Sequence, residues 1–439
     1  MDGGDVLGEG QPGQGDDSQR QAGDGGSGGE PQPQTAAEIL DQGKAAGGGR
    51  RTVAAKVGLT ASVIAGVAVA AGIGGLALMA HTSSSHGAGN VRAAGAQAKG
   101  NPNATPLKVV AISPAANTKH VNGATTVMVD LSAPLASDSA KPSFRPAVAG
   151  QWQASGSTLS FVPSAPFSPS TRYTLVIPGG RMGLHSNAGG LLAKSKQIRF
   201  TTGGYSQLRL AEVLSQLGYL PMTWQQTGSV RVPAGQATSG VAGQERLAYS
   251  PPPGKFTWKS GYPASLRASW IPGHPNVVVR GAVMAFQAQH RLAINGLATK
   301  KFWTKLFAAA ASSQSNTVGY SYAIASKGSP ETLTIWHDGH KVLRSLANTG
   351  ISIDPTASGS YPVYLRFRFQ IMQGTNPDGS HYADPVSYVS YFDGGEAVHY
   401  FPRGSYGYPQ SLGCIELPMN DAKRAWPYLT YGSLVTVTG

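Results

Sequence analysis

Short runs of β-branched and aromatic residues dominate the first folded stretch of the chain, residues 106–203. Turn residues separate these runs at intervals of roughly 10–15 residues, a spacing typical of a β-sandwich. No combination of acid, base and nucleophile stands out here, so we expect a spacer or positioning domain. The predicted strands are Lys108–Ile112, Thr126–Leu131, Thr158–Val162 and Tyr173–Ile177.

Residues 204–312 change to the periodicity of amphipathic helices. In the first half, apolar residues recur on one helical face up to Gly218, which is placed to end the helix. A Gly- and Pro-rich insertion, about residues 221–275, separates it from a second apolar pattern, so the sequence predicts a small helical module with an insertion. The apolar positions are Leu208, Leu210, Val213, Leu214 and Leu217, then Met284, Phe286, Leu292, Ile294, Trp303, Leu306 and Phe307.

The last stretch, residues 316–439, returns to strand-like alternation. Side chains from Thr332 to Trp336 alternate between two faces, and the Asp338-Gly339 pair after them is typical of a hairpin turn. The pattern predicts an all-β domain with one short helix. The further strand-rich segments are Tyr361–Met372, Ser387–Phe392, Ala397–Tyr400 and Leu434–Val437, and the helix is Asn420–Trp426.

The N-terminal part of the chain is of a different kind. Residues 1–52 contain almost no large apolar side chain, which predicts a disordered tail because too little apolar surface is buried to offset ordering entropy. Residues 53–81 include an uncharged segment of 24 residues, Val57–Ala80. As a helix this segment spans about 36 Å, enough to cross a bilayer. Lys and Arg residues precede it, so the positive-inside rule predicts a cytoplasmic tail and an external remainder.

A cleaved signal peptide ending near Ala80 is the alternative to this anchor. The long preceding tail and the length of the apolar segment favour an uncleaved, single-pass anchor. Residues 82–105 are rich in Ser, Gly, Ala and Asn, which predicts a flexible linker. We therefore expect a mainly β protein with an N-terminal transmembrane helix, a β-sandwich, a small helical module and a final all-β domain.

Charge narrows the range of partners. The net charge is +13, but residues 1–80 have five Lys and Arg against nine Asp and Glu, whereas the remainder has thirty against thirteen. The basic part predicts attraction to an anionic surface, such as nucleic acid or an anionic cell wall. No dense run of Lys and Arg interleaves with aromatic residues, so we expect no nucleic-acid binding.

The chain has a single cysteine, Cys414, so no intrachain disulfide and no C-x-x-C metal or redox pattern can form. Gly413 precedes it, and a tight turn there can present the sulfur beside backbone N–H groups that hold an oxyanion. A thiolate nucleophile needs a base or cation beside it, and His399, 15 residues earlier at the end of an apolar strand, is best placed. A small buried cysteine and a structural histidine are the alternative interpretation.

The combination of these residues resembles the L,D-transpeptidase family, whose catalytic domain is also called the YkuD domain. That family has a His, about fifteen residues, and then Ser/Thr-His-Gly-Cys. The resemblance covers about 120 residues and implies that residues 316–439 form the all-β catalytic domain. The matching segments are Ser411-Leu412-Gly413-Cys414 after His399, Asn348-Thr349-Gly350, Pro355-Thr356 with Gly359, Met372-Gln373-Gly374, Tyr382, and the closing YGSLVTV.

The resemblance implies a cysteine acyltransferase that acts on peptidoglycan stem peptides and requires no metal or other cofactor. Cys414 would attack the carbonyl between the third, diamino residue and the terminal D-alanine of a tetrapeptide. An amine of a second stem would then attack the thioester and give a 3→3 cross-link. His399 would accept and return the proton. The oxyanion and substrate residues that the resemblance implies are Gly413, Tyr382, Ser411 and Tyr400, with the Tyr400 carbonyl orienting the imidazole.

The sequence departs from the family pattern at two positions. Leu412 stands where the family has the second His, and Glu416 stands where it has Arg. A carboxylate close to the thiol would raise the pKa of that thiol. Two alternatives stay open: an L,D-carboxypeptidase, in which water replaces the acceptor amine, and a non-catalytic wall-binding protein with a decayed site.

The preceding segments show resemblances too. Residues 106–203 resemble the bacterial Ig-like domain found before catalytic domains in cell-wall enzymes. The segments LAEVLSQLGYLP and GAVMAFQAQHRLAINGLATKKFWTKL resemble the two halves of a peptidoglycan-binding three-helix repeat, interrupted by the insertion. Together with the predicted anchor, these resemblances imply a protein of the cell membrane whose catalytic domain works outside the cytoplasm at the cell wall.

Three weaker patterns have structural interpretations. The segment His337–His340 fits a hairpin turn more simply than a metal pair. Asp393 and Glu396 fit a hairpin turn better than a pair of catalytic acids, which would face each other across a cleft. Aromatic residues in the insertion could stack on sugars or pack locally. These are Trp224, Trp258 and Trp270.

Overall fold

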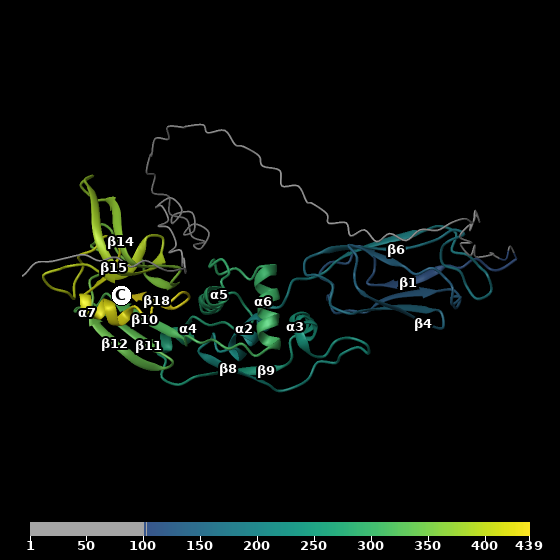
Figure 1. Cartoon of the computed structure of the whole chain (residues 1–439), viewed down its shortest axis with the longest axis horizontal. Helices are drawn as coiled ribbons and strands as arrows, with labels where there is room; N and C mark the ends of the chain where they lie inside the picture. Colours follow the sequence, from purple (N-terminus) through teal and green to yellow (C-terminus); the bar gives the residue numbers. More distant parts are fainter. Residues whose placement is uncertain (1–100, 102) are drawn as a thin grey trace, which may run out of the picture.

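The computed structural model describes residue 101 and residues 103–439, which form three parts in chain order (Figure 1). We call them the N-terminal domain (residues 103–203), the middle module (204–312) and the C-terminal domain (316–439). The predictions of a tail over residues 1–52 and an anchor over 53–81 lie outside the described residues, as does nearly all of the 82–105 linker. Among the described residues, no helix has the length and apolar character needed to cross a membrane.

The N-terminal domain is a β-sandwich, as predicted. Its core is an aromatic cluster in which Phe167 contacts the rings of Phe144, Tyr173 and Phe200. One sheet has the order β1-β2-β5-β4 and the other β3-β6-β7. The strands are β1 (Val109–Ser113), β2 (Val127–Leu131), β3 (Ser143–Arg145), β4 (Gly150–Ser155), β5 (Thr158–Pro163), β6 (Arg172–Ile177) and β7 (Lys196–Thr201).

The middle module is helical, and its insertion carries structure of its own. Side-chain oxygens of Ser206, Asn276 and Thr299 accept backbone hydrogen bonds and so start α2, α5 and α6. Gly218 (φ +80°) follows the first of these helices, as the sequence predicts. The elements are α2 (Gln207–Gln216), β8 (Met222–Gln226), α3 (Gly240–Tyr249), β9 (Gly254–Trp258), α4 (Ala264–Ala268), α5 (Val277–Gln289) and α6 (Lys300–Ala311).

The C-terminal domain consists of two sheets and one helix, so its prediction as mainly β is confirmed. The first sheet has the order β12-β11-β10-β18-β13 and the second β14-β15-β16-β17. Its elements are β10 (Ser321–Ser326), β11 (Thr332–His337), β12 (His340–Leu346), β13 (Gly359–Pro362), β14 (Leu365–Thr375), β15 (His381–Asp393), β16 (Glu396–Tyr400), β17 (Ile415–Leu417), α7 (Met419–Ala425) and β18 (Leu434–Thr438).

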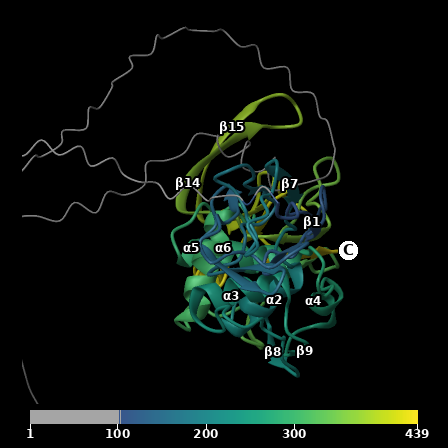
Figure 2. The ribbon, with the colours of Figure 1, turned by 90° about the vertical axis from the view of Figure 1, so that its right-hand side faces the viewer.

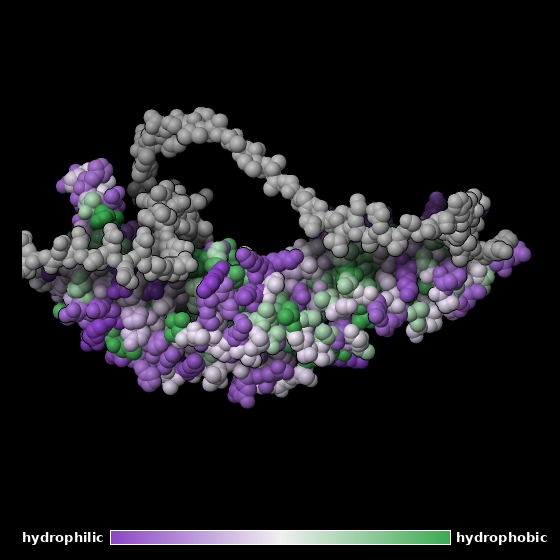
Figure 3. Space-filling model, viewed as in Figure 1, coloured by the Kyte–Doolittle hydropathy of each residue, from purple (hydrophilic) through white to green (hydrophobic). Residues whose placement is uncertain are grey.

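One predicted strand of this domain is divided. The segment Tyr361–Met372 contributes to β13 in the first sheet and β14 in the second, with Val363 and Tyr364 buried at the crossing. After the crossing, β14 and β15 form a long antiparallel hairpin that projects from the domain (Figures 1 and 2). Its tip is hydrophilic, with hydrophobic surface below it (Figure 3).

The middle module shares a hydrophobic core with the C-terminal domain. Tyr320, Tyr322 and Leu434 of the C-terminal domain belong to the same buried cluster as the helices of the module. Two glycines meet at this interface: a Cβ added to Gly281 in α5 would lie 2.5 Å from the Gly432 carbonyl oxygen. Only glycine allows the two backbones to pack this closely.

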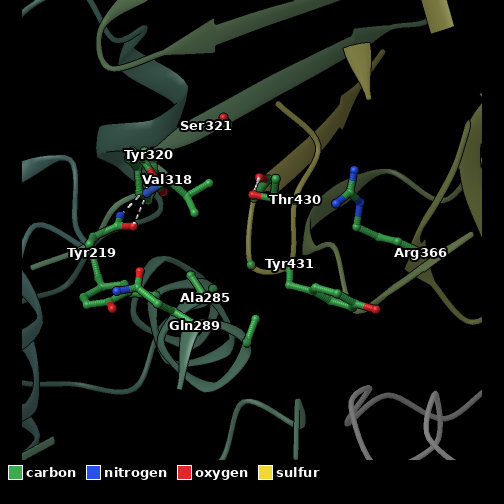
Figure 4. Close-up of a pocket in the computed structure, with 16 residues that line it drawn as sticks. Tyr219, Ala285, Gln289, Val318, Tyr320, Ser321, Arg366, Thr430 and Tyr431 are labelled. Atoms are coloured by element: carbon green, nitrogen blue, oxygen red, sulfur yellow. Dashed lines mark hydrogen bonds between the residues drawn. The ribbon is translucent and has the colours of Figure 1, made fainter. Parts of the chain in front are cut away.

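A cavity of about 270 Å³ lies beside this contact (Figure 4). Its lining comes from both parts of the chain, so the interface combines a tight backbone contact with unfilled space next to it. Tyr219, Ala285 and Gln289 line it from the middle module, and Ser321, Arg366, Thr430 and Tyr431 from the C-terminal domain.

The middle module also contacts the N-terminal domain through polar groups. The Tyr249 hydroxyl donates to the Phe167 carbonyl at 2.7 Å, and the Gln236 side-chain amide donates to the Ala124 carbonyl at 2.7 Å. A Cβ added to Gly123 would overlap the Tyr249 ring. The module therefore bridges the two β-domains.

We expect Gly281→Val to lower the free energy of unfolding by about 1–3 kcal/mol, because the new side chain overpacks a tight interface. Gly404→Ala is the control, since a Cβ there would have no neighbour within 4 Å. Chemical denaturation followed by tryptophan fluorescence measures both. Equal stability of the two variants would show that the glycine contact is not close in solution.

Candidate active site

The two predicted catalytic residues lie on neighbouring strands. His399 is in β16, and Cys414 immediately precedes β17, which pairs with β16 in parallel. The register sets His399 opposite Glu416, two residues after the cysteine. Both side chains are buried, with Cys414 7% and His399 3% exposed. The fold therefore places His399 and Cys414 on adjacent segments, and no hydrogen bond joins their side chains.

The turn before the cysteine depends on Gly413. Its φ of +92° is rarely adopted by residues with a side chain, and a Cβ there would contact the Glu396 side chain at 3.4 Å. The Ser411 hydroxyl closes the turn by donating to the Cys414 carbonyl at 2.6 Å. Ser411 also binds the segment that contains Thr349, donating its N–H to that residue's carbonyl at 3.1 Å. Ser411 and Gly413 thus shape the turn that presents Cys414.

The imidazole of His399 is held by one ring nitrogen, which leaves the other available. Nδ1 lies 3.0 Å from the Tyr400 carbonyl oxygen, the contact that the family resemblance implied. Because a carbonyl only accepts, Nδ1 carries the proton and Nε2 has a free lone pair. Nε2 is buried and has no hydrogen-bond partner among the described residues. Burial lowers the pKa of His399, so the ring is neutral near pH 7.

Burial has the opposite effect on the thiol. It raises the pKa of Cys414 to about 12, and the carboxylates of Glu396 and Glu416 add to that shift. Sγ lies 4.0 Å from the Gly395 carbonyl oxygen, which accepts a weak hydrogen bond from a protonated thiol. The resting pair is therefore a neutral thiol and a neutral imidazole, rather than a thiolate and an imidazolium.

Three tyrosines surround the cysteine. Burial, with smaller contributions from the charges of Asp393 and Cys414, raises the pKa of Tyr364 to about 12. Tyr391 and Tyr382 are affected in the same way by burial and by Cys414. The Tyr391 hydroxyl donates to Gln370 at 3.0 Å, whereas the Tyr364 hydroxyl is buried without a partner among the described residues.

The sequence pointed to Tyr382 but missed the other two tyrosines. Tyr364 and Tyr391 lie within stretches that read as ordinary strands, where aromatic residues are common. Tyr382 sits on the projecting hairpin opposite Gly374, where a Cβ would overlap its hydroxyl. That glycine belongs to the Met372-Gln373-Gly374 motif, so the motif makes room for a tyrosine of the site.

Glu416, which stands where the family pattern has Arg, has its negative charge paired with a nearby arginine. Arg403 binds the Glu416 carboxylate through two nitrogens, at 2.7 and 2.8 Å, and its guanidinium lies 4.6 Å from the Phe401 ring centroid. Glu416 also exchanges two backbone hydrogen bonds with Asn348. The charge that the sequence suggested would disturb the thiol is therefore largely paired. Nothing in the structure explains Leu412 in place of the second His.

Glu396 is a second carboxyl group near the cysteine. It accepts the backbone N–H of Ala357 at 3.0 Å, which ties the loop before β13 to the start of β16. Burial raises the pKa of Glu396 to about 8. Asp393 and Glu396 are directly opposite each other across the β15–β16 turn, so their interpretation as a hairpin turn is confirmed.

The other weak patterns also have local structural explanations. Trp258 and Trp270 pack edge to face against each other and against the core of the middle module, and Trp224 packs on Phe256. The segment His337–His340 forms the turn between β11 and β12. Within residues 103–439, no three His, Cys, Asp or Glu side chains gather as metal ligands.

Two family models match the chain. Residues 103–202 match the bacterial Ig-like domain, and residues 320–437 match the L,D-transpeptidase catalytic domain. Neither match includes the middle module, so its resemblance to a peptidoglycan-binding repeat stays a prediction. No curated protein matches the chain.

Solved structures with similar chains are also L,D-transpeptidases. An L,D-transpeptidase from Mycobacterium smegmatis is 14% identical and covers 76% of this chain and 100% of its own, with a TM-score of 0.26. L,D-transpeptidase 3 from Mycobacterium tuberculosis is 15% identical and covers 75% of this chain and 98% of its own, with a TM-score of 0.26. The catalytic domain from E. faecium L,D-transpeptidase is 25% identical and covers 28% of this chain and 98% of its own, with a TM-score of 0.25. These TM-scores are too low to support an inference about this chain.

We expect alkylation of Cys414 by iodoacetamide to accelerate about tenfold per pH unit from pH 7 to 10, because only the thiolate reacts and the thiol pKa is raised. Intact-mass spectrometry reports the rate directly, since the chain has one cysteine. Free N-acetylcysteine is the control, and its rate levels off near its ordinary thiol pKa of about 8.5. A rate for the protein that is flat between pH 6 and 8 would instead indicate a resting thiolate.

Arg403→Met should lower the free energy of unfolding by about 3 kcal/mol, because it leaves the buried Glu416 carboxylate unpaired. Adding Glu416→Gln should recover part of that loss. Arg424→Met is the matched control: it breaks an ion pair with Asp421 in which the arginine side chain is 63% exposed, which costs at most about 1 kcal/mol. Urea denaturation measures the free energy of unfolding of all three variants. Similar losses for Arg403→Met and Arg424→Met would contradict the buried pairing.

Proposed function

We propose that this chain, which carries an L,D-transpeptidase catalytic domain at residues 320–437 behind a bacterial Ig-like domain, forms 3→3 cross-links in peptidoglycan through a cysteine acyl-enzyme. The observation that carries the proposal is the pairing of β16 with β17. It sets the buried His399 Nε2, which has no hydrogen-bond partner among the described residues, beside the strand that directly follows Cys414. A lone pair without a partner in a buried site is poised to accept a proton.

The neutral resting pair determines the order of the proposed steps. His399 Nε2 accepts the thiol proton as Sγ of Cys414 attacks the carbonyl of the third stem residue. The C–N bond to D-alanine then breaks, and the imidazolium returns the proton to the leaving amine. The acceptor amine attacks the thioester, His399 takes a proton from that amine, and the thiol is regenerated. No step in this sequence needs a cofactor.

Developing negative charge on the carbonyl oxygen needs donors in the site. The backbone N–H groups of Gly413 and Cys414 are the proposed oxyanion donors, in the turn that the positive φ of Gly413 allows. Tyr382 reaches this region from the hairpin, and the charge of Cys414 contributes to its raised pKa after the larger effect of burial. Ser411 and Tyr400 act by holding the turn and the imidazole.

The setting of the reaction is also a proposal. The excess of Lys and Arg after residue 80 would favour an anionic cell wall, and stem peptides would be the substrate. We propose that residues 53–81 anchor the chain in the cell membrane with residues 1–52 in the cytoplasm and the catalytic domain outside. The N-terminal domain and the bridging middle module would then hold the site away from the membrane.

Incubating the full chain in detergent with a disaccharide-tetrapeptide tests this function. We expect a cross-linked dimer that lacks one D-alanine, detected by mass spectrometry, and no product from Cys414→Ser, which retains a hydroxyl but not a thiol. Ser164→Ala, an exposed change in the N-terminal domain, is the control and should match the parent chain.

Other products would redirect the assignment. Tripeptide without dimer would show an L,D-carboxypeptidase, in which water takes the place of the acceptor amine. Unchanged tetrapeptide, together with retention of the chain on purified cell wall, would support a non-catalytic wall-binding protein. Equal turnover by Cys414→Ser and the parent chain would exclude the cysteine mechanism.

A further inference from the structure

A cleft of about 830 Å³ lies between the middle module and the C-terminal domain. Helix α5 and the loop after it form one wall, and β13 with the β15–β16 turn forms the other. The helix also packs directly against β13. The lining residues that the argument uses are Arg280, Met284, Gly296, Tyr364 and Asp393.

Two opposite charges line this cleft. Arg280 comes from α5 and Asp393 from the end of β15. Burial lowers the pKa of Arg280 and raises that of Asp393, and the opposite charge of each partner counters both shifts. Across residues 103–439, neither side chain makes a hydrogen bond, and their charged atoms are not within the 4.0 Å of an ion pair.

The position of Arg280 is built into the loop after α5. Gly296 has a φ of +71°, and a Cβ there would lie 2.8 Å from Cγ of Arg280. This glycine therefore makes room for the arginine stem and leaves the guanidinium without a partner from the described part of the chain. A half-buried guanidinium has lost part of its hydration, and a carboxylate ligand would restore those hydrogen bonds in a bidentate geometry.

The cleft adjoins the catalytic cysteine. Met284 and Tyr364 line the cleft, and both belong to the hydrophobic cluster that contains Cys414. Gly394 also lines it, and the next residue, Gly395, contacts the Cys414 sulfur through its carbonyl. The Tyr364 side chain is 6% exposed, and its hydroxyl has no partner among the described residues. The Tyr364 hydroxyl can therefore donate a hydrogen bond to a ligand, from a residue that lies in the same cluster as the thiol.

We propose that this cleft binds the side chain of the third stem residue of the acyl donor, with Arg280 on a carboxylate and Asp393 on an ammonium group. The ligand class is the zwitterionic end of an amino acid, as in a diamino diacid. The inference rests on the function proposed above, which places the carbonyl of that same residue at Cys414. Its side chain must therefore start close to the sulfur, and Met284 and Tyr364 join the cleft to the hydrophobic cluster around that sulfur.

The proposal gives the middle module a role in specificity. A lysine-type third residue carries the ammonium group alone and would engage Asp393 without Arg280. A diamino diacid whose distal carboxylate is amidated loses its charge at the same position. These two substrates therefore separate the contribution of Arg280 from that of the rest of the cleft.

The test measures D-alanine release by the full chain in detergent from three disaccharide-tetrapeptides, which carry diaminopimelate, its distally amidated form, or lysine. We expect the parent chain to have a kcat/KM for the free diacid roughly 10- to 100-fold above that for the amide, mostly through KM, as for a charged hydrogen bond. Arg280→Gln should bring that ratio close to one by losing activity on the free diacid only.

Two further variants make the test specific. Arg280→Lys keeps the charge without the bidentate geometry and should give an intermediate ratio. Arg231→Gln removes an exposed arginine from the same module, outside the cleft, and should keep the ratio of the parent chain. If Arg280→Gln does not fold, as judged by circular dichroism, Arg280→Lys takes its place: a ratio below that of the parent chain supports the subsite, and an unchanged ratio overturns it.

The outcomes separate the two proposals. Release of D-alanine with no preference for the free diacid, or a preference that both Arg280 variants retain, overturns the subsite while the transpeptidase proposal stands. No release from any of the three peptides by the parent chain overturns the proposed function and the subsite with it.

Discussion

The pairing of β17 with β16 is the constraint on which the site depends, because a strand of only three residues, Ile415–Leu417, sets the position of the cysteine before it. Such a short strand needs support from both sides. Val398 and His399 pair with it on one edge, and Asn348 exchanges two backbone hydrogen bonds with Glu416 on the other. The Glu416 side chain adds its ion pair with Arg403, so one residue secures the strand through its main chain and its side chain together.

The same burial that fixes these residues sets their chemistry. Burial of the site makes a charge on either group unfavourable, so the thiol keeps its proton and the imidazole stays neutral. In the proposed mechanism, proton transfer between them would be coupled to arrival of the substrate, whose carbonyl would receive the developing charge. Within the described part of the chain, the buried hydroxyl of Tyr364 and Nε2 of His399 are the polar groups of the site without a hydrogen-bond partner. They mark where substrate atoms would complete the site.

Local patterns in the sequence predicted the secondary structure and turns that short-range interactions determine, but few of the contacts between distant segments. The β-sandwich, the helix at Asn420–Trp426 and the hairpin turns at Asp338 and Asp393 follow from short-range periodicity and turn chemistry, and the structure has them. Cys414 and His399 could be found because a motif links them along the chain. Arg403, Tyr364 and Arg280 could not, because only the tertiary fold brings them to Glu416, to the Cys414 cluster and to the cleft, respectively. The divided strand at Tyr361–Met372 has the same origin: continuous alternation does not reveal that a chain changes sheets.

The buried, protonated state of Cys414 has a consequence for the lifetime of the protein. Oxidation of cysteine to sulfenic acid begins from the thiolate and requires access to the sulfur. Cys414 is 7% exposed and retains its proton across the neutral pH range, so peroxide finds little of the reactive form. With one cysteine in the chain, there is no second thiol to form a protective disulfide within it. Shielding by burial thus protects the one sulfur on which the proposed mechanism depends.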